Sequence, residues 1–171
     1  MSHIIDIFEV ARAKTTVTGT IPLDEMPELA LSVAEVEGEG LRYEITGMGT
    51  IERLPAATLK IEGDVVMACA RCMQSVTVPV DREVVFCFVK NEEEADNLPL
   101  EEEDDEIEVI VGSRRLSIAA WVQEETILSL PSMPMHEDCD LDWEEEEDEE
   151  IPVEEEKPNP FAALAALKTK H

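Results

Sequence analysis

Residues 64–80, D-V-V-M-A-C-A-R-C-M-Q-S-V-T-V-P-V, hold two alternating apolar runs separated by a C-x-x-C motif. Val65 and Met67 alternate with other side chains before the motif, and Val76 and Val78 do so after it. A period of two is typical of β-strands, so we expect two strands with the cysteines in the connection between them. Two thiols at this spacing can face each other across a tight turn, as in zinc knuckles and dithiol redox centres.

The strand pattern extends outward over most of residues 41–89, with further alternating runs at 41–45, 59–61 and 84–88. Glycine and proline interrupt it where a bulge, a kink or an edge is expected, at Gly47, Gly49, Pro55, Gly63 and Pro79. These residues predict the α+β class: an antiparallel β-sheet meander, curled as far as a partial barrel, whose apolar face packs on one main helix.

That helix is predicted over about residues 116–130. Ser117 is suited to the N-cap and Pro131 to the stop. One stripe of the helix carries the apolar side chains of Ile118, Trp121, Val122 and Leu128. Glu125 falls on the same stripe. It lies either at the edge of the interface or against a partner such as an arginine, because a buried unpaired charge is too costly to keep.

The remaining elements are shorter. Asp6 is a suitable cap for a helix over residues 6–14, and the β-branched run at 15–21 predicts a strand. Residues 23–31 are expected to form a helical turn or a loop. The alternation of Ile107, Val109 and Val111 predicts a returning strand.

The formal net charge of −28 is distributed unevenly along the 171 residues. Residues 91–156 hold 27 of the 41 acids and only two bases, so the other 105 residues sum to −3. We therefore expect one β-rich domain at 1–139, with a solvated acidic loop at 92–106 inside it, followed by a disordered acidic linker at 140–157.

Residues 158–171 predict a short C-terminal helix, capped by Asn159 with Pro160 at its first position. A helix of this length is marginal in water, so it should form when docked, either on the body of this chain or in a partner's groove. The candidate partner-binding residues are Trp143 in the linker and Phe161, Leu164 and Leu167 on one side of the helix.

Several classes of function are disfavoured. Three histidines, no glycine-rich phosphate loop and carboxylates confined to low-complexity runs predict a protein that is not an enzyme and has no small-molecule substrate. The start of the chain does not resemble a secretory signal, and no run approaches the roughly 20 apolar residues of a membrane span. The cytoplasm is the expected location, where cysteines are usually thiols or metal ligands.

Cys69, Cys72, His136 and Cys139 form the candidate metal site, as C-x-x-C and H-x-x-C pairs of the types that hold structural zinc. The simpler interpretation is small buried thiols with a surface histidine. A dithiol redox centre is a third reading, but such motifs open a helix, whereas strands flank this one. Cys87 is expected to be a core or face residue of its strand.

Three stretches in succession resemble the bacterial YceD family of large ribosomal RNA subunit accumulation proteins. They are C-A-R-C-M at 69–73, the helix W-V-Q-E-E-T-I-L-S-L-P-S-M-P-M-H at 121–136, and P-N-P-F-A-A-L-A-A-L-K at 158–168. The resemblance covers most of residues 57–170. It implies a non-enzymatic factor needed for the synthesis, processing or stability of large-subunit (23S) ribosomal RNA, in a bacterial cytoplasm or an organelle derived from one.

Two hypotheses join the charge pattern to this resemblance. In the first, acidic segments bind a basic ribosomal protein or large-subunit assembly factor, because an anionic chain is a poor direct ligand for phosphate backbones except through a local patch. In the second, a zinc-stabilised module contacts ribosomal RNA directly through a basic face made of Arg42, Arg53, Lys60, Arg71, Arg82 and Lys90.

Overall fold

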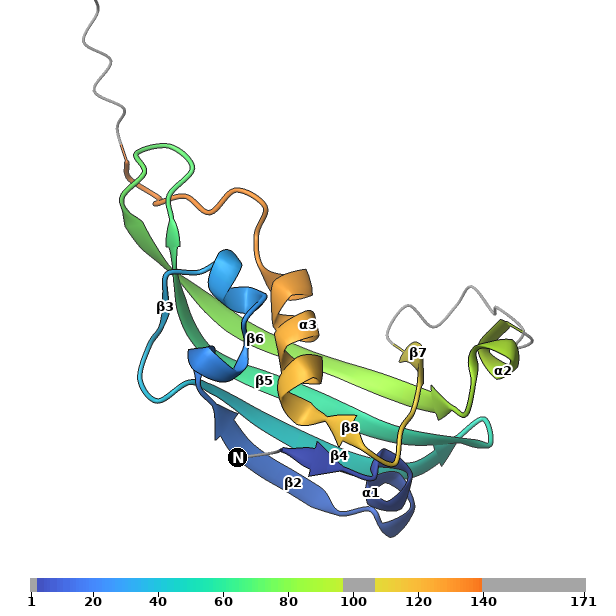
Figure 1. Cartoon of the computed structure of the whole chain (residues 1–171). Coiled ribbons are helices and arrows are strands. Elements are labelled where there is room, and N and C mark those ends of the chain that lie inside the picture. The colour runs from blue at the N-terminus through green and yellow to red at the C-terminus, as the bar shows by residue number, and fades with distance from the viewer. Residues whose placement is uncertain (1–2, 97–106, 140–171) are drawn as a thin grey trace, which may run out of the picture. The chain divides into compact units, whose positions relative to one another are not determined.

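A computed structural model describes residues 3–96 and 107–139, and residues 1–140 form one compact unit (Figure 1). Its centre is a six-stranded sheet in the order β2-β4-β5-β6-β7, with β3 added beside β5. The strands of this sheet are β2 (Thr16–Ile21), β3 (Glu35–Val36), β4 (Leu41–Ile51), β5 (Leu54–Ala68), β6 (Ser75–Val89) and β7 (Ile107–Val111). The α+β class predicted from the sequence is confirmed.

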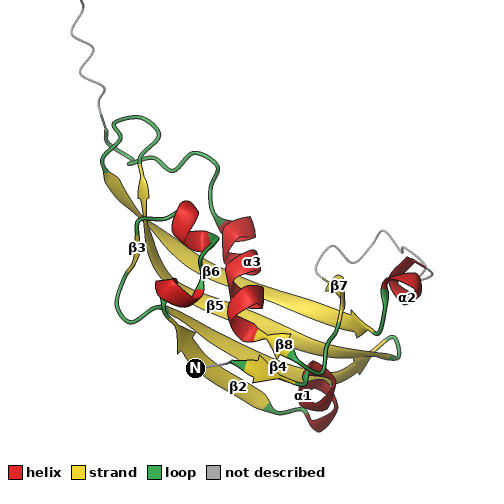
Figure 2. Ribbon diagram, in the orientation of Figure 1, coloured by secondary structure: helices red, strands yellow, loops and turns green. Residues whose placement is uncertain are grey.

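The meander prediction holds for β2, β4, β5 and β6, because these four strands pair with one another antiparallel. A register shift between Gly47 and Gly49 confirms the bulge in β4. β7 differs, because it pairs with β6 in parallel, from Val85↔Ile107 to Val89↔Val111. A parallel neighbour needs a connection of a dozen or more residues, which residues 90–106 provide. Between β2 and β7 the described sheet stays open, so its curl does not close into a barrel (Figure 2).

Helix α3 (Ile118–Ser129) lies across the concave face of the sheet, together with the 3₁₀ turns η1 (Leu23–Glu25) and η2 (Leu29–Leu31) (Figure 2). Ser117 caps it as predicted, and its side chain accepts a hydrogen bond from the Ala120 amide. Trp121 packs edge-on against Phe86 and Phe88 of β6 and so joins helix to sheet. Leu128 was wrongly placed on the buried stripe, since 68% of its surface is exposed.

Glu125 is buried, with 5% of its surface exposed, and the arginine alternative is the correct one. The Arg82 guanidinium donates through Nε to Glu125 Oε2 at 2.8 Å and through Nη2 to Glu108 Oε1 at 3.1 Å. Burial nevertheless raises the pKa of Glu125, and the hydrogen bond from Arg82 offsets only part of that rise. The three side chains tie α3, β6 and β7 together.

The N-terminal segment closes one end of the sheet. Helix α1 (Ile7–Ala13) begins at Asp6, whose side chain accepts from the amides of Phe8 and Glu9 as predicted. It packs directly on β4 at Gly47, where a Cβ would overlap the Val10 carbonyl. The short strands β1 (Ile4–Ile5) and β8 (Leu116–Ser117) pair antiparallel, so the Ile7 amide at the start of α1 donates to the Ser113 carbonyl and the Ile118 amide at the start of α3 donates to the His3 carbonyl.

Part of the predicted acidic loop is helical, because α2 (Glu92–Asp96) follows β6 and the Asn91 side chain accepts from the Glu94 amide at its start. The rest of that loop, the linker at 140–157 and the helix at 158–171 lie outside the described residues. So do the docking candidates Trp143, Phe161, Leu164 and Leu167. Among the helices that are described, none has the length and apolar character needed to cross a membrane.

Candidate metal centre

The C-x-x-C motif occupies the turn that joins β5 to β6, as the sequence predicted. The Cys69 amide donates to the Gln74 carbonyl and the Met73 amide donates to the Cys69 carbonyl, so the turn is closed by its own backbone. Met73 adopts a φ of 61°, which reverses the chain within a short loop. Both thiols are thereby held at the tip of the longest hairpin in the described chain.

The segment after α3 runs to this tip (Figure 1). The Ala70 amide donates to the Pro134 carbonyl at 2.7 Å, and the Arg71 guanidinium donates to the Cys139 carbonyl at 2.9 Å. These two hydrogen bonds place residues 134–139 along the turn. They bring together the two halves of the candidate site, which are more than sixty residues apart in the sequence.

The ligand atoms of Cys69, Cys72, His136 and Cys139 all lie within 4.8 Å of one another. The sulfurs of Cys69 and Cys139 are 3.6 Å apart, and the Cys72 sulfur is 3.5 Å from His136 Nδ1. A tetrahedral zinc site, with bonds of about 2.3 Å to sulfur and 2.0–2.1 Å to nitrogen, has ligand separations of about 3.8 and 3.6 Å. The two measured separations fit that geometry, and the four cysteines of the chain are free thiols.

His136 is oriented for this role by its other ring nitrogen. Nε2 lies 2.9 Å from the Ser75 carbonyl, which can only accept, so Nε2 donates to it and Nδ1 is the ring nitrogen that faces Cys72. The Ser75 carbonyl is the main reason that the pKa of His136 is raised, and Cys69 adds to the effect. A carbonyl behind a histidine ring is the usual outer support of a metal ligand.

Hydrogen bonds around Cys69 favour its thiolate form. Its pKa is lowered to about 5 by hydrogen bonds from backbone amides, those of Cys72 and then Arg71 and His136, which outweigh the effect of burial. Burial raises the pKa of Cys139, and its hydrogen bond to Cys69 raises it further. Four ligands from the protein leave no open position for water or substrate, so this set of donors suits a structural metal ion.

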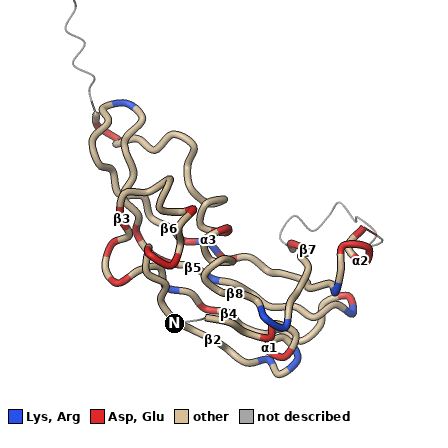
Figure 3. The backbone as a smooth tube through the Cα atoms, in the orientation of Figure 1, with Lys and Arg blue, Asp and Glu red and all other residues tan. Residues whose placement is uncertain are grey.

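The structure does not gather the six predicted RNA-contacting bases on one face. Arg42 and Lys60 lie on the outer face of the sheet, where the register places them among Glu44, Glu62, Asp81 and Glu83. Arg82 points to the opposite face and is bound to Glu125 and Glu108. Arg71 lies at the hairpin tip, whereas Arg53 and Lys90 lie at the other end of the sheet (Figure 3).

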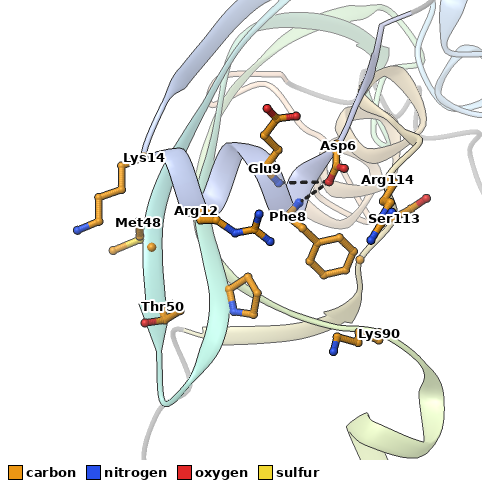
Figure 4. A pocket seen from close by; sticks show the side chains of 13 residues that line it. Asp6, Phe8, Glu9, Arg12, Lys14, Met48, Thr50, Lys90, Ser113 and Arg114 are labelled. Atoms are coloured by element: carbon orange, nitrogen blue, oxygen red, sulfur yellow. Dashed lines mark hydrogen bonds between the residues drawn. The ribbon is translucent and has the colours of Figure 1, made fainter.

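A different group of bases, missed in the sequence, surrounds a pocket at that other end: Arg12, Lys14, Lys90 and Arg114 (Figure 4). Only Lys90 was among the predicted contacts. For Arg114, a signal that could have found it is that it is one of only two bases within residues 91–156, whereas no such signal distinguishes Arg12 and Lys14.

A family model described as large ribosomal RNA subunit accumulation protein YceD matches residues 57–168, about two thirds of the chain. The chain belongs to the YceD family. The matched region includes all four candidate metal ligands. A protein of Haemophilus influenzae, named large ribosomal RNA subunit accumulation protein YceD, is 29% identical over 169 residues, which cover 97% of this chain and 95% of that protein. No solved structure matches this YceD family member.

Proposed function

We propose that this YceD family member is a non-enzymatic, cytoplasmic factor that supports the synthesis, processing or stability of large-subunit (23S) ribosomal RNA. The observation that carries the proposal is the similarity to the Haemophilus influenzae protein of that name, which extends over nearly the full length of both chains. A closed candidate metal site, in place of an open catalytic one, supports the non-enzymatic part.

A gene replacement tests this proposal. In a bacterium that lacks its own family member, expression of this chain should restore the ratio of large-subunit to small-subunit ribosomal RNA, measured on total RNA. A ratio that is normal before the chain is added, or that stays low after it is added, would reject the proposal. A chain with Cys87→Ser, which changes a thiol outside the candidate site, is the matched control.

The partner in this proposal is a basic ribosomal protein or large-subunit assembly factor, bound by the acidic segments. Their sequence supports this, because residues 91–156 carry 27 acids against two bases. Attraction between exposed charges weakens as the Debye length falls to about 8 Å at physiological ionic strength. Pull-downs with purified large-subunit proteins over a salt series should show binding that declines with salt. Binding that is absent, or that does not respond to salt, would contradict this mechanism.

Zinc is the metal proposed for the site of Cys69, Cys72, His136 and Cys139. The separations of 3.6 and 3.5 Å and the hydrogen bond from His136 to Ser75 support zinc over a simple group of buried thiols. Metal analysis of protein purified without a histidine tag should find one zinc per chain. Cys72→Ser should lose it and Cys87→Ser should keep it. Zinc-free wild-type protein would contradict the assignment.

The second hypothesis, direct contact with ribosomal RNA through Arg42, Arg53, Lys60, Arg71, Arg82 and Lys90, has less support. These side chains lie on two faces and at two ends of the sheet, and Arg82 is already bound to two carboxylates. The six residues therefore do not form the single basic face that this hypothesis expects.

A further inference from the structure

The pocket at the α1 end of the sheet encloses about 1000 Å³. Its wall is formed by α1, by the end of β4 after the bulge, by the start of β5, and by the residues that follow β6 and β7. Four cations line it: Arg12 in the last turn of α1, Lys14 at the helix C-cap, Lys90 directly after β6, and Arg114 before β8 (Figure 4). The fold thus brings cations from three separate segments, α1 with its C-cap and the residues after β6 and β7, to one basic site.

Within residues 3–96 and 107–139, these cations have no ion-pair partner. None of the four forms a side-chain ion pair with a described residue, whereas Lys60 and Arg82 elsewhere in the sheet do. The pocket also contains two carboxylates, Asp6 and Glu9, but Asp6 is engaged as the cap of α1. In a chain of net charge −28, a cluster of four cations without ion pairs is suited to an external anion.

An aromatic ring accompanies the cations. Phe8 is half-buried, lies in the pocket close to Arg12 and Arg114, and leans on Gly112, where a Cβ would come within 2.7 Å of its ring (Figure 4). Sites for single-stranded nucleic acid usually combine two components: cations that contact the phosphates, and an aromatic ring on which a base stacks.

We infer that this pocket binds single-stranded RNA, with Arg12, Lys14, Lys90 and Arg114 contacting its phosphates and Phe8 stacking against a base. The choice of RNA as the anion rests on the proposed function, while the basic site itself rests on the geometry. The cations of this pocket take an anion, whereas the acidic segments of the sequence suit a ligand of opposite charge, so the two proposals concern different ligands.

Salt dependence of RNA binding tests the phosphate contacts. Fluorescence anisotropy of a labelled single-stranded RNA is titrated with the full chain at several salt concentrations. The slope of the logarithm of the association constant against the logarithm of the salt concentration should be about −3 for four phosphate contacts. The double variant Arg12→Ala with Arg114→Ala should reduce the slope to about −1.5. The control Arg42→Ala with Lys60→Ala removes the same charge from the outer face and should leave the slope unchanged. Equal losses in both double variants would overturn the assignment.

Phe8→Leu tests the stacking contact. It keeps an apolar side chain against Gly112 and should weaken RNA binding about tenfold without changing the salt slope. Thermal unfolding of each variant confirms that it is folded. An oligoglutamate peptide and inorganic phosphate serve as competitors. If either displaces RNA at equal charge concentration, or if Phe8→Leu binds normally, the pocket is a general anion site and the inference is overturned.

Failure of this inference is distinguishable from failure of the proposed function. If the wild-type chain does not bind RNA through the pocket, only the inference is overturned, because a basic protein partner could still connect the chain to ribosomal RNA. A chain that binds RNA through the pocket and yet does not restore the ribosomal RNA ratio in cells would overturn the proposed function alone.

Discussion

The two ends of the β5–β6 hairpin carry opposite kinds of chemistry. At its tip, three cysteines and a histidine converge on a space that fits one metal ion, and the contacts there join the segment after α3 to the sheet. At the other end, four cations surround an open pocket without ion pairs to described residues. The difference teaches that the side chains at the tip contact one another, whereas the cations at the α1 end are placed to bind an anion from outside the described residues.

The largest effect is expected from removing the metal proposed for the site at the tip. Cys72→Ser, or dialysis of the wild type against a chelator, should lower the free energy of unfolding by about 4 kcal/mol, as for a ligand held a thousandfold above its dissociation constant. Denaturant unfolding with metal analysis measures it. Cys87→Ser should retain its zinc, and equal losses in the two serine variants would remove the distinction between the sites.

The next largest effect on stability is expected from breaking the ion pair of Arg82 with Glu125, which lies between the two ends of the hairpin. Arg82→Ala leaves Glu125 buried without its main partner and should cost about 3 kcal/mol, measured by the same denaturant unfolding. The double variant Arg82→Met with Glu125→Leu should recover much of that loss, because it removes both charges together. If Arg82→Ala alone is neutral, the pair does not hold α3 to the sheet.

The pH dependence of stability gives a smaller effect. Burial raises the pKa of Glu125 above its ordinary value of 4.5, so the folded state binds the proton more tightly than the unfolded state. Its contribution is therefore fully present below pH 4.5 and is lost as the pH rises through the higher pKa of the folded state, by at most about 1.4 kcal/mol per pH unit. Wild type should lose stability relative to Glu125→Gln over this range, and parallel curves would contradict the raised pKa.

The smallest effect on stability is expected at the pocket. Arg114→Ala should change the free energy of unfolding by no more than about 0.5 kcal/mol, because the side chain makes no described ion pair. The same variant should weaken RNA binding measurably. A variant that unfolds easily would instead show that the basic end, like the tip, serves the fold.

The elements that could be predicted from the sequence are those whose signal is local. Asp6 and Ser117 cap their helices because a side-chain oxygen reaches an amide two or three residues away. Gly47 and Gly49 mark the bulge because glycine tolerates the positive φ, 87° at Gly49, that a bulge can require. The C-x-x-C turn follows from the strands on both sides of it. The cysteine and histidine pairs were candidates because their residue types are rare in this chain and match zinc chemistry.

Other features could not be read locally. The parallel pairing of β7 depends on how the chain returns after β6, and the exposure of Leu128 depends on which side of α3 faces the sheet. The sequence placed Glu125 on the apolar stripe with an arginine as one alternative, but it did not indicate that this arginine is Arg82, more than forty residues earlier. The periodicity of a sequence indicates which side chains form an apolar face, but it does not indicate which other element packs against that face.

By itself, the sequence determined the strands, the caps, the uneven charge and the types of side chain able to bind a metal, because these depend on neighbours along the chain. Only the tertiary structure decided which distant groups meet. It brought His136 and Cys139 to the hairpin turn and converged Arg12, Lys14, Lys90 and Arg114 on one pocket. The physical reason is that coordination and charge clustering depend on distances in space, and those distances exist only after the sheet has brought its strand ends together.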